Sequence, residues 1–269
     1  MGAMQAGTLW IVATPIGNLD DLAPRAVAVL RAVALVACED TRHSAGLFAR
    51  FGIGTPTLPL HEHNEREAAD RVLARLRAGD SVALVSDAGT PLVSDPGFRL
   101  VAAAREAGLR VSTVPGPCAL VAALSVSGLP TDRFCFEGFL PPKSAARRAR
   151  LEVLALDPRT LVLYESKHRI VECLQDLVAT LGAQRRATVA RELTKLHETI
   201  LAGTLEQLHA QVLADPEQQL GEFVVVVEGA PDDAEAARLR EGERVLRLLA
   251  EELPGSRAAK LAAAITGAP

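Results

Sequence analysis

Short apolar runs alternate with helix-like segments through the first half of this chain, and this alternation limits the folds open to it. The strand-like runs are residues 9–13, 34–38, 81–85 and 110–114. The segments between them repeat apolar residues at the helical period, at residues 22–30, 44–51, 66–76 and 100–107. Such alternation predicts βαβ units, and therefore a mostly parallel sheet that helices cover on both faces.

Two polar loops follow neighbouring strand-like runs in this pattern. Residues 86–97, with the sequence Ser-Asp-Ala-Gly-Thr-Pro-Leu-Val-Ser-Asp-Pro-Gly, come directly after the run at 81–85. Residues 115–119, Pro-Gly-Pro-Cys-Ala, follow the run at 110–114 and open another helix. Ligands of open α/β sheets bind at the carboxyl ends of strands, where backbone N–H groups are unpaired. The two loops therefore predict one shared pocket.

The second half of the chain predicts a separate α/β unit. Glycine and proline at residues 127–130 indicate a boundary. Beyond it we predict strands at 134–139, 160–164, 187–191, 199–202 and 223–227, helices at 170–181 and 205–213, and a terminal helix pair at 235–253 and 256–265. Some connections are too short for parallel crossovers, which favours a mixed sheet. We predict domains at residues 7–128 and 132–230 and a small helical extension at 233–269.

The short apolar runs and the spacing of the cysteines predict a cytoplasmic protein. No apolar stretch approaches the roughly 18 residues that span a bilayer, and no basic region precedes the first apolar run. The four cysteines, Cys38, Cys118, Cys135 and Cys173, lack C-x-x-C spacing and are expected to be reduced. We therefore expect a protein without a membrane partner.

Basic residues concentrate in the second half of a chain whose formal net charge is −4. Lys143 and Arg147 are four residues apart, so they can share one helix face. Together with others they can form a rim that binds RNA phosphates; the candidates are Lys143, Arg147, Arg148, Arg150, Arg169, Arg191 and Lys195. The alternative is an ordinary solvated helix face. Since aromatic residues are only 3% of the chain, we expect recognition of a folded RNA rather than of many unstacked bases.

Two polar clusters provide candidate catalytic residues. Asp40 and Arg42 follow a buried strand, where they can pair near an acceptor, although Asp40 can equally be a helix N-cap. His61 and Asn64 form the second cluster, and a histidine near neutral pKa suits proton removal. Neither cluster identifies the general base.

Several long motifs, in order, carry a family resemblance. They include Thr-Pro-Ile-Gly-Asn-Leu at 14–19, Glu-Asp-Thr-Arg at 39–42, the loops at 86–97 and 115–119, Glu-Gly-Phe-Leu-Pro at 137–141, Tyr-Glu-Ser-Lys-His-Arg at 164–169 and Arg-Glu-Leu-Thr-Lys at 191–195. From about Thr8 to Val227 the chain resembles the 16S ribosomal RNA 2′-O-ribose methyltransferases of the tetrapyrrole methylase superfamily.

The resemblance implies an α/β fold of two α/β/α domains, the first sheet mostly parallel and the second mixed, with a C-terminal helical extension. It implies a homodimer that holds S-adenosyl-L-methionine between its domains and methylates a decoding-centre cytidine, in 16S rRNA or the assembled small ribosomal subunit. No metal is required. By their place in the motifs, the expected cofactor-binding residues are Pro15, Gly17, Asp87, Ala88, Gly89, Thr90, Val93, Cys118, Ala119, Tyr164 and Glu165.

Three other functions stay open at this point. The same fold can methylate a tetrapyrrole or another small molecule, because fold does not determine the acceptor. A non-catalytic ribosome-assembly factor would bind cofactor or RNA without turnover. A metal-dependent hydrolase would use Asp87 and Asp95, but no His or Glu accompanies them at ligand spacing.

Overall fold

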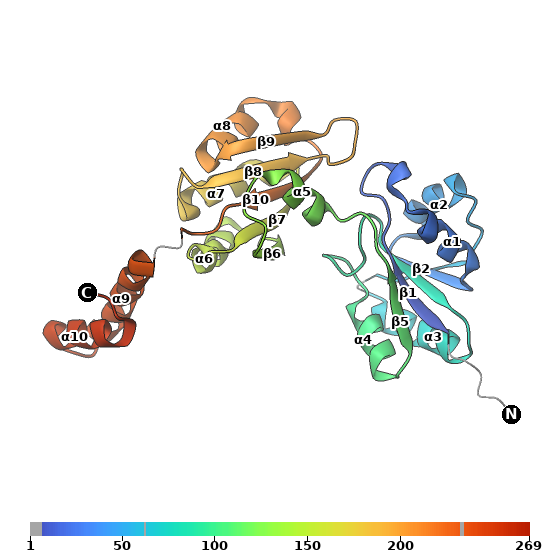
Figure 1. Ribbon diagram of the computed structural model, residues 1–269, viewed down its shortest axis with the longest axis horizontal. Coiled ribbons are helices and arrows are strands. Elements are labelled where there is room, and N and C mark those ends of the chain that lie inside the picture. Colours follow the sequence, from blue (N-terminus) through green and yellow to red (C-terminus); the bar gives the residue numbers. More distant parts are fainter. Residues whose placement is uncertain (1–6, 62, 232–233) are drawn as a thin grey trace.

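The computed structural model describes residues 7–61, 63–231 and 234–269, and it folds into two α/β lobes and a terminal helix pair (Figure 1). The first lobe contains a five-stranded sheet in the order β3-β2-β4-β1-β5. Its strands are β1 (Thr8–Val12), β2 (Leu35–Cys38), β3 (Thr57–Pro59), β4 (Val82–Val85) and β5 (Arg110–Val114). All its strand pairs are parallel, as the alternating sequence pattern predicts.

Helices cover both faces of this first sheet. They are α1 (Pro24–Ala32), α2 (Thr41–Arg50), α3 (Glu65–Arg77) and α4 (Phe98–Glu106), with a short 3-10 helix η1 (Leu19–Asp21) before α1. One apolar core joins α3 and α4 to one face, and a second core joins α1 and α2 to the other. The loops at the carboxyl ends of the strands are therefore left uncovered, and they face the second lobe (Figure 1).

The second lobe contains a mixed sheet in the order β6-β7-β10-β8-β9. Its strands are β6 (Phe134–Phe139), β7 (Thr160–Ser166), β8 (Arg186–Arg191), β9 (Thr199–Thr204) and β10 (Glu222–Val227). Only β6 pairs with its neighbour β7 in parallel; β10 is antiparallel to β7 and β8, and β8 to β9. Short connections allow antiparallel pairing, so the prediction of a mixed sheet is confirmed.

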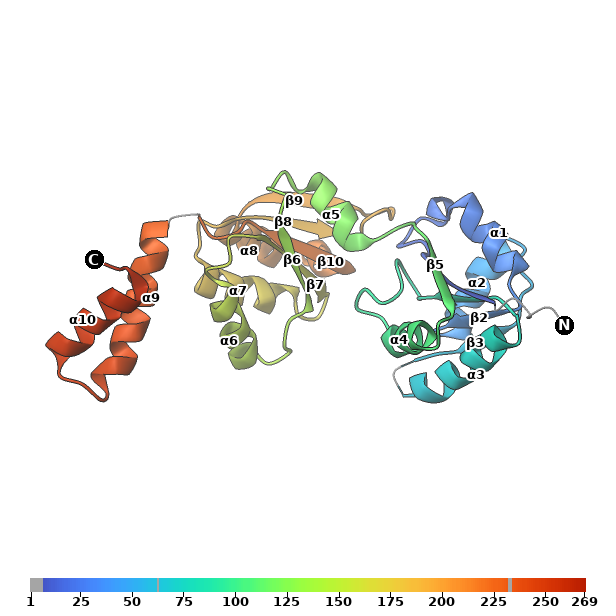
Figure 2. The ribbon, with the colours of Figure 1, turned by 60° about the horizontal axis from the view of Figure 1, so that its bottom comes forward.

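Both faces of the second sheet are buried, which explains the uninterrupted apolar run in β10. Phe223, Val225 and Val227 pack with α6 (Ser144–Leu154), α7 (Ile170–Leu181) and α8 (Leu205–Ala214). Val224 and Val226 point to the opposite face, where α5 (Ala119–Ser127) lies (Figure 2). Because alternate residues of a strand face opposite ways, a strand buried on both sides needs apolar residues throughout.

The position of α5 corrects one expectation. We predicted this helix as the last element of the first domain, yet Leu120, Ala123 and Leu124 pack on the second sheet. The sequence predicts an apolar helix here but does not show which sheet it covers. The chain therefore passes from one lobe to the other before α5, in the loop after β5.

Two other elements differ from the sequence-based expectation. Strand β3 was not predicted, because Thr57–Pro59 is only three residues long and contains a proline. Helix α2 begins at Thr41 rather than at 44, since the Asp40 side chain accepts from the Arg42 N–H at 2.8 Å and caps the helix. The structure therefore shows Asp40 as the N-cap of α2, which is one of the two roles that the sequence allowed.

A terminal pair of helices follows β10. Helices α9 (Ala234–Ala250) and α10 (Gly255–Thr266) pack on each other, with Ala258 and Ala262 buried (Figure 1). No helix in the described part of the chain is long and apolar enough to cross a membrane.

A buried ion pair joins α6 to α7 in the second lobe. The fully buried Arg147 guanidinium donates through Nε to Asp176 Oδ2 at 2.7 Å. Ser144 Oγ donates to the other carboxylate oxygen at 3.0 Å, and Arg148 donates to it as well. Burial opposes ionisation of Asp176, but these hydrogen bonds outweigh it and hold the pKa of that carboxyl below its usual value.

Replacing Asp176 tests how far the second lobe depends on this pair. We expect Asp176→Ala to lower the free energy of unfolding by about 3–5 kcal/mol, because it removes the buried carboxylate that neutralises Arg147 and leaves that charge only the exposed Glu172 at 3.6 Å and the Pro142 carbonyl. The depressed pKa also means that this stability is present above pH 3.8, the ordinary Asp value, and is lost as the pH falls through the folded-state pKa. Urea unfolding at several pH values measures both effects.

The control is Glu241→Ala, which removes an exposed partner of Arg244 in α9. That change should leave the free energy of unfolding nearly unchanged. Equal losses in the two variants would contradict a special role for the buried pair.

Candidate functional site

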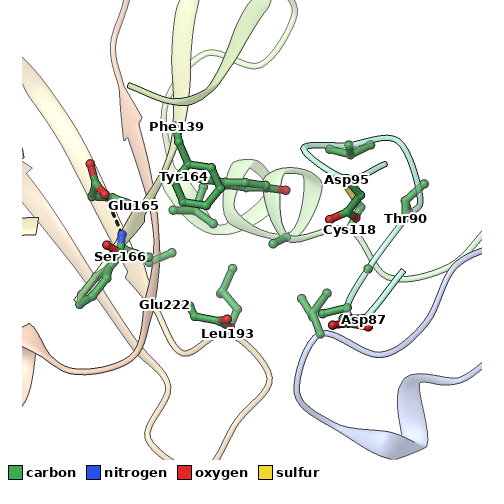
Figure 3. Close-up of a pocket in the computed structure, with 18 of the residues that line it drawn as sticks. Asp87, Thr90, Asp95, Cys118, Phe139, Tyr164, Glu165, Ser166, Leu193 and Glu222 are labelled. Atoms are coloured by element: carbon green, nitrogen blue, oxygen red, sulfur yellow. Dashed lines mark hydrogen bonds between the residues drawn. The ribbon is translucent and has the colours of Figure 1, made fainter. Parts of the chain in front are cut away.

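A cavity of about 370 Å³ lies between the two lobes (Figure 3), within the roughly 300–1,000 Å³ typical of small-molecule sites. One wall consists of loops at the carboxyl ends of the first sheet, and the other is the face of the second sheet that carries α5. The residues that line it are Ile16, Glu39, Asp87, Ala88, Gly89, Thr90, Val93, Asp95, Cys118, Ala119, Phe139, Tyr164, Glu165, Ser166, Ala190, Leu193, Lys195, Glu222, Phe223 and Val224.

Backbone hydrogen bonds connect the loops that form the first wall. Thr14 and Gly89 pair through both backbone groups, at 2.9 and 3.1 Å, which joins the loop after β1 to the loop after β4. The buried Thr14 hydroxyl donates to the Ser86 carbonyl at 3.1 Å. Thr90 Oγ1 donates to the Pro117 carbonyl at 2.9 Å, which adds the loop after β5. The wall is therefore one connected unit, as the shared pocket predicted from sequence requires.

The loop at residues 86–97 carries backbone strain. Leu92 and Ser94 have φ values of 74° and 66°, a region that non-glycine residues rarely occupy. Its far end is held by Glu65, whose Oε1 accepts from the N–H groups of Gly97 and Arg99, both at 3.0 Å. This carboxylate from α3 satisfies free donors at the start of α4, so the strained loop is held at both ends.

Tyr164 is the central side chain of the second wall. Its hydroxyl accepts from the Leu120 N–H at 3.1 Å, at the start of α5. Burial, together with the neighbouring Cys118, raises the pKa of this phenol, so Tyr164 stays protonated at neutral pH. Its ring contacts Phe136 and Phe139 edge to face, with ring centroids 4.8 and 5.8 Å from that of Tyr164. Figure 3 shows Phe139 beside Tyr164.

The two lobes touch directly beside the cavity. A Cβ added at Gly17 would come within 2.3 Å of Lys195 Cγ, so only glycine allows this approach. The adjacent Asn18 N–H donates to Thr194 Oγ1 at 3.2 Å. Thr194 and Glu192, in the loop between β8 and β9, have φ values of 66° and 50°. Strained backbone therefore occurs on both sides of the cavity.

Lys195 does not present a free cation to the cavity. Its ammonium group donates to Glu192 Oε1 at 2.8 Å and to Glu222 Oε2 at 2.9 Å. Burial disfavours the charge, but these two carboxylates outweigh it and hold the pKa of Lys195 above its usual value. This lysine, which we predicted to bind RNA, instead connects the β8–β9 loop to β10.

Carboxylates in the cavity differ in how they are engaged. Asp87 Oδ1 accepts from the Asp40 N–H at 3.1 Å. Glu165 is buried, accepts from the Ser166 N–H at 2.8 Å and pairs with Arg169 at 3.2 Å. Burial raises the pKa of Asp95 and outweighs the Ser86 hydroxyl, which lowers it, while the charge of Asp87 raises it further. Asp95 is thus the carboxylate whose environment favours proton uptake.

The structure brings most of the predicted cofactor residues to the cavity. Nine of the predicted residues line it, namely Asp87, Ala88, Gly89, Thr90, Val93, Cys118, Ala119, Tyr164 and Glu165. Pro15 and Gly17 do not line it; Ile16 between them does. Sequence reasoning named Asp95 only for the hydrolase alternative and did not place it in the cofactor site, although it lies in the loop that we singled out. It missed Phe139, whose position depends on a bulge that the sequence does not show.

The four predicted catalytic residues lie outside the cavity lining. Asp40 pairs with Arg42 at 2.8 Å on the surface, and hydrogen bonds from Arg42 lower the pKa of Asp40 to about 2. His61 and Asn64 form a local turn, in which the His61 N–H donates to Asn64 Oδ1 at 2.9 Å. Asn64 Nδ2 donates to the Pro59 carbonyl at 3.0 Å. The Asp40 and Asn64 side chains thus bind backbone N–H groups near the strand ends, and none of the four residues lines the cavity.

Most of the predicted RNA-binding cations have partners within the protein. Arg147 and Arg191 are buried; Arg147 pairs with Asp176, and Arg191 donates to the Leu220 and His197 carbonyls. Arg148 and Arg150 pair with Asp176 and Glu137, and Arg169 with Glu165. Six of the seven predicted side chains therefore form ion pairs or hydrogen bonds within the protein. A sequence shows that a residue is charged, but it does not show which partner that residue meets in the fold. Lys143 is exposed and forms no ion pair among the described residues.

Residues 7–61, 63–231 and 234–269 contain no group of three or more His, Cys, Asp and Glu side chains arranged to hold a metal ion. All four cysteines have free thiols.

Comparison with known proteins shows which family has this sequence and architecture. The family model "Tetrapyrrole (Corrin/Porphyrin) Methylases" matches residues 8–209, and the model "RsmI C-terminal HTH domain" matches residues 230–269. The chain is 62% identical over 263 residues to ribosomal RNA small subunit methyltransferase I of Xylella fastidiosa, covering 98% of this chain and 96% of that protein. It is 52% identical over 264 residues to the protein of that name from Escherichia coli O157:H7, covering 97% of this chain and 91% of that protein.

A solved structure shares the fold at low sequence identity. Uroporphyrin-III C-methyl transferase from Thermus thermophilus, complexed with S-adenyl homocysteine, is 21% identical with a TM-score of 0.54. The match covers 82% of this chain and 97% of that one. With one family model matching most of its length and relatives above half identity, the chain belongs to the tetrapyrrole methylase family, among the ribosomal RNA small subunit methyltransferases I.

Proposed function

We propose that this protein transfers a methyl group from S-adenosyl-L-methionine to the ribose 2′-hydroxyl of a decoding-centre cytidine in 16S rRNA. Ribosomal RNA as the acceptor is supported by relatives 62% and 52% identical over almost the whole chain, which are named as small-subunit ribosomal RNA methyltransferases. Solved structures of tetrapyrrole-modifying enzymes that share the fold are 17–23% identical to this chain, which supports a common fold and does not identify the acceptor.

The cavity fits the methyl donor of this family. S-adenosylmethionine combines an ammonium, ribose hydroxyls and an adenine, and the cavity offers carboxylates and apolar surface together. Asp87 and Glu165 can accept hydrogen bonds from the polar groups, and Ile16, Val93 and Leu193 can contact the base. Because Asp87 and Glu165 lie on opposite walls, they can hold one molecule only when the two lobes face each other as they do here. Binding of the cofactor would therefore stabilise this arrangement of the lobes.

The residues around the cavity suit alkylation of a hydroxyl. When bound, the cofactor supplies an electrophilic methyl group on a sulfonium, and the protein must orient the acceptor and take its proton. Asp95 lies in the wall, and the pKa of its carboxyl is raised by burial, which makes it a stronger base than an exposed aspartate. Asp95 would accept the hydroxyl proton, while Asp87 and Glu165 stay engaged in binding.

The RNA contact would use cations that no carboxylate engages. Lys143 precedes α6, and Lys167 directly follows the cavity residue Ser166; both are exposed and form no ion pair among the described residues. Free ammonium groups near the cavity can bind phosphates by releasing counterions. Of the expected basic rim, this proposal keeps Lys143 and includes Lys167 beside the cavity.

We also propose a homodimer in the cytoplasm. On the β8–β9 hairpin the apolar side chains of Leu196 and Ile200 are 92% and 39% exposed. Apolar surface of this kind is typical of contacts with another chain. Light scattering of the purified protein measures the mass, and a monomer at all concentrations would contradict the dimer.

The function is tested by transfer of labelled methyl from S-adenosylmethionine to small ribosomal subunits, free 16S rRNA and a tetrapyrrole precursor. We expect label in RNA at a position that resists alkaline cleavage, because a 2′-O-methyl group blocks that reaction. The Asp87→Ala variant should lose cofactor binding and label together. Label in the tetrapyrrole, or binding without transfer to any acceptor, would contradict the proposal in favour of a small-molecule methylase or a non-catalytic assembly factor.

The role of Asp95 predicts a specific pH profile. Asp95 must be ionised to take the proton, so the rate should fall as the pH drops through its raised pKa. Asp95→Asn should reduce the rate of methyl transfer by about 10²–10⁴-fold and remove this acid limb. Single-turnover rates between about pH 3 and pH 9 provide the measurement, because this range includes the ordinary Asp pKa near 3.9. The exposed Asp132→Asn is the control, and an unchanged limb in Asp95→Asn would exclude this base.

The role of the two lysines predicts a change in salt dependence. The double variant Lys143→Ala and Lys167→Ala should weaken RNA binding and reduce the slope of log K against log salt by about 1–2 units. Filter binding of 16S rRNA at several salt concentrations measures this slope. Arg77→Ala is the matched control, because Arg77 is exposed at the end of α3, away from the strand ends that form the cavity. Equal slopes for both variants would contradict the assignment.

A further inference from the structure

Phe139 is an aromatic side chain that is 53% exposed although it lines the cavity. It ends β6 and lies beside Tyr164, on the wall opposite Asp87 and Asp95 (Figure 3). Large aromatic rings are generally buried, and this chain has few of them. An exposed aromatic ring in the wall of a ligand site therefore indicates a surface that a bound ligand covers.

A β-bulge places this ring on the cavity side. Phe136 pairs with Val162 and Phe139 with Tyr164, so four residues of β6 (136–139) oppose three of β7 (162–164). Without the bulge, Phe136 and Phe139 would point to opposite faces, since side chains alternate along a strand. With it, both rings contact Tyr164, at 4.8 and 5.8 Å. Bulges re-aim side chains in this way next to active sites.

Contacts on both sides of Phe139 hold its backbone in place. Gly138 has a φ of 61°, and a Cβ there would lie 3.2 Å from Ser94 Oγ of the first lobe, directly before Asp95. The Leu140 carbonyl accepts from Arg169 Nη2 at 2.6 Å, and Arg169 is itself paired with Glu165. The Phe139 ring is thus held against Tyr164 while about half of the residue's surface, 53%, remains exposed.

We propose that Phe139 is a stacking surface for the unpaired base of the acceptor nucleotide. This inference rests on the proposed RNA substrate and names how its base is held. A nucleotide must leave its stack before its ribose can enter a cavity between two lobes, and an aromatic face compensates the lost stacking. A base on Phe139 would place its ribose toward Asp95, across the contact between Gly138 and Ser94. Exposed Lys143, four residues further on, would meet the phosphates.

Kinetics of Phe139 variants test the stacking surface. Phe139→Leu keeps an apolar side chain without the ring, and we expect the KM for small ribosomal subunits or 16S rRNA to rise roughly 5- to 150-fold. Phe139→Trp keeps a ring and should retain a KM near that of the original protein. The cofactor Kd, measured by calorimetry, should stay unchanged in both. Phe134→Leu is the matched control, since Phe134 is also exposed, at 42%, on the same strand but outside the cavity lining.

The outcomes separate this inference from the proposed function. Methyl transfer by the original protein with an unchanged KM in Phe139→Leu would overturn the stacking surface and leave the function intact. Weaker cofactor binding in Phe139→Leu, in proportion to the RNA effect, would overturn it in favour of contact with the cofactor adenine.

A direct binding assay covers the case in which no acceptor is methylated. The variant Phe139→Trp in a Trp10→Phe background has one indole, because Trp10 is the chain's only tryptophan. A short cytidine-containing single-stranded RNA should quench its fluorescence in the presence of S-adenosylmethionine. Absence of quenching in a variant whose thermal unfolding matches the original would overturn the inference.

Discussion

The hydrogen bond from the Leu120 N–H to the Tyr164 hydroxyl fixes the start of α5 on the second sheet, and one wall of the cavity depends on this contact. It forms where the chain leaves the first sheet, and it satisfies a free donor at the start of α5 with a side chain from β7. Cys118 and Ala119 precede this point and line the cavity together with Tyr164. The same hydroxyl thus caps the start of a helix, holds that helix on the second sheet and belongs to a side chain of the ligand wall, so its removal would disturb all three.

Most of the predicted RNA-binding cations in the second lobe are engaged in ion pairs or hydrogen bonds within the protein. The guanidinium groups of α6 neutralise Asp176 and Glu137, and Lys195 holds Glu192 and Glu222 around a strained turn. Such pairs fix loops and helices but leave little charge for a polyanion. An acidic protein that binds RNA in this way would depend on a few exposed lysines and on the shape of its cavity, rather than on a broad positive surface.

Sequence reasoning succeeded where local pattern determines structure. Parallel strands followed from alternating apolar periods, and the loop at 86–97 could be placed at the cavity because polar residues follow a buried strand. It failed where distant partners decide. Arg147 looked like a surface cation because its partner Asp176 is 29 residues away on another helix. Phe139 escaped notice because a bulge changes which face it occupies, and α5 because an apolar helix fits either sheet.

The left-handed backbone at Leu92, Ser94, Glu192 and Thr194 has a consequence for the evolution of this protein. Each such residue costs of order 1–3 kcal/mol, and the remainder of the fold must offset that cost. Glycine at these positions would relieve the strain and increase the freedom of both loops beside the cavity. Variants selected only for heat resistance would therefore accumulate such relaxing changes, and they would lose the rigidity that holds the two walls in register. Retention of residues other than glycine at these four positions would indicate selection for catalytic turnover.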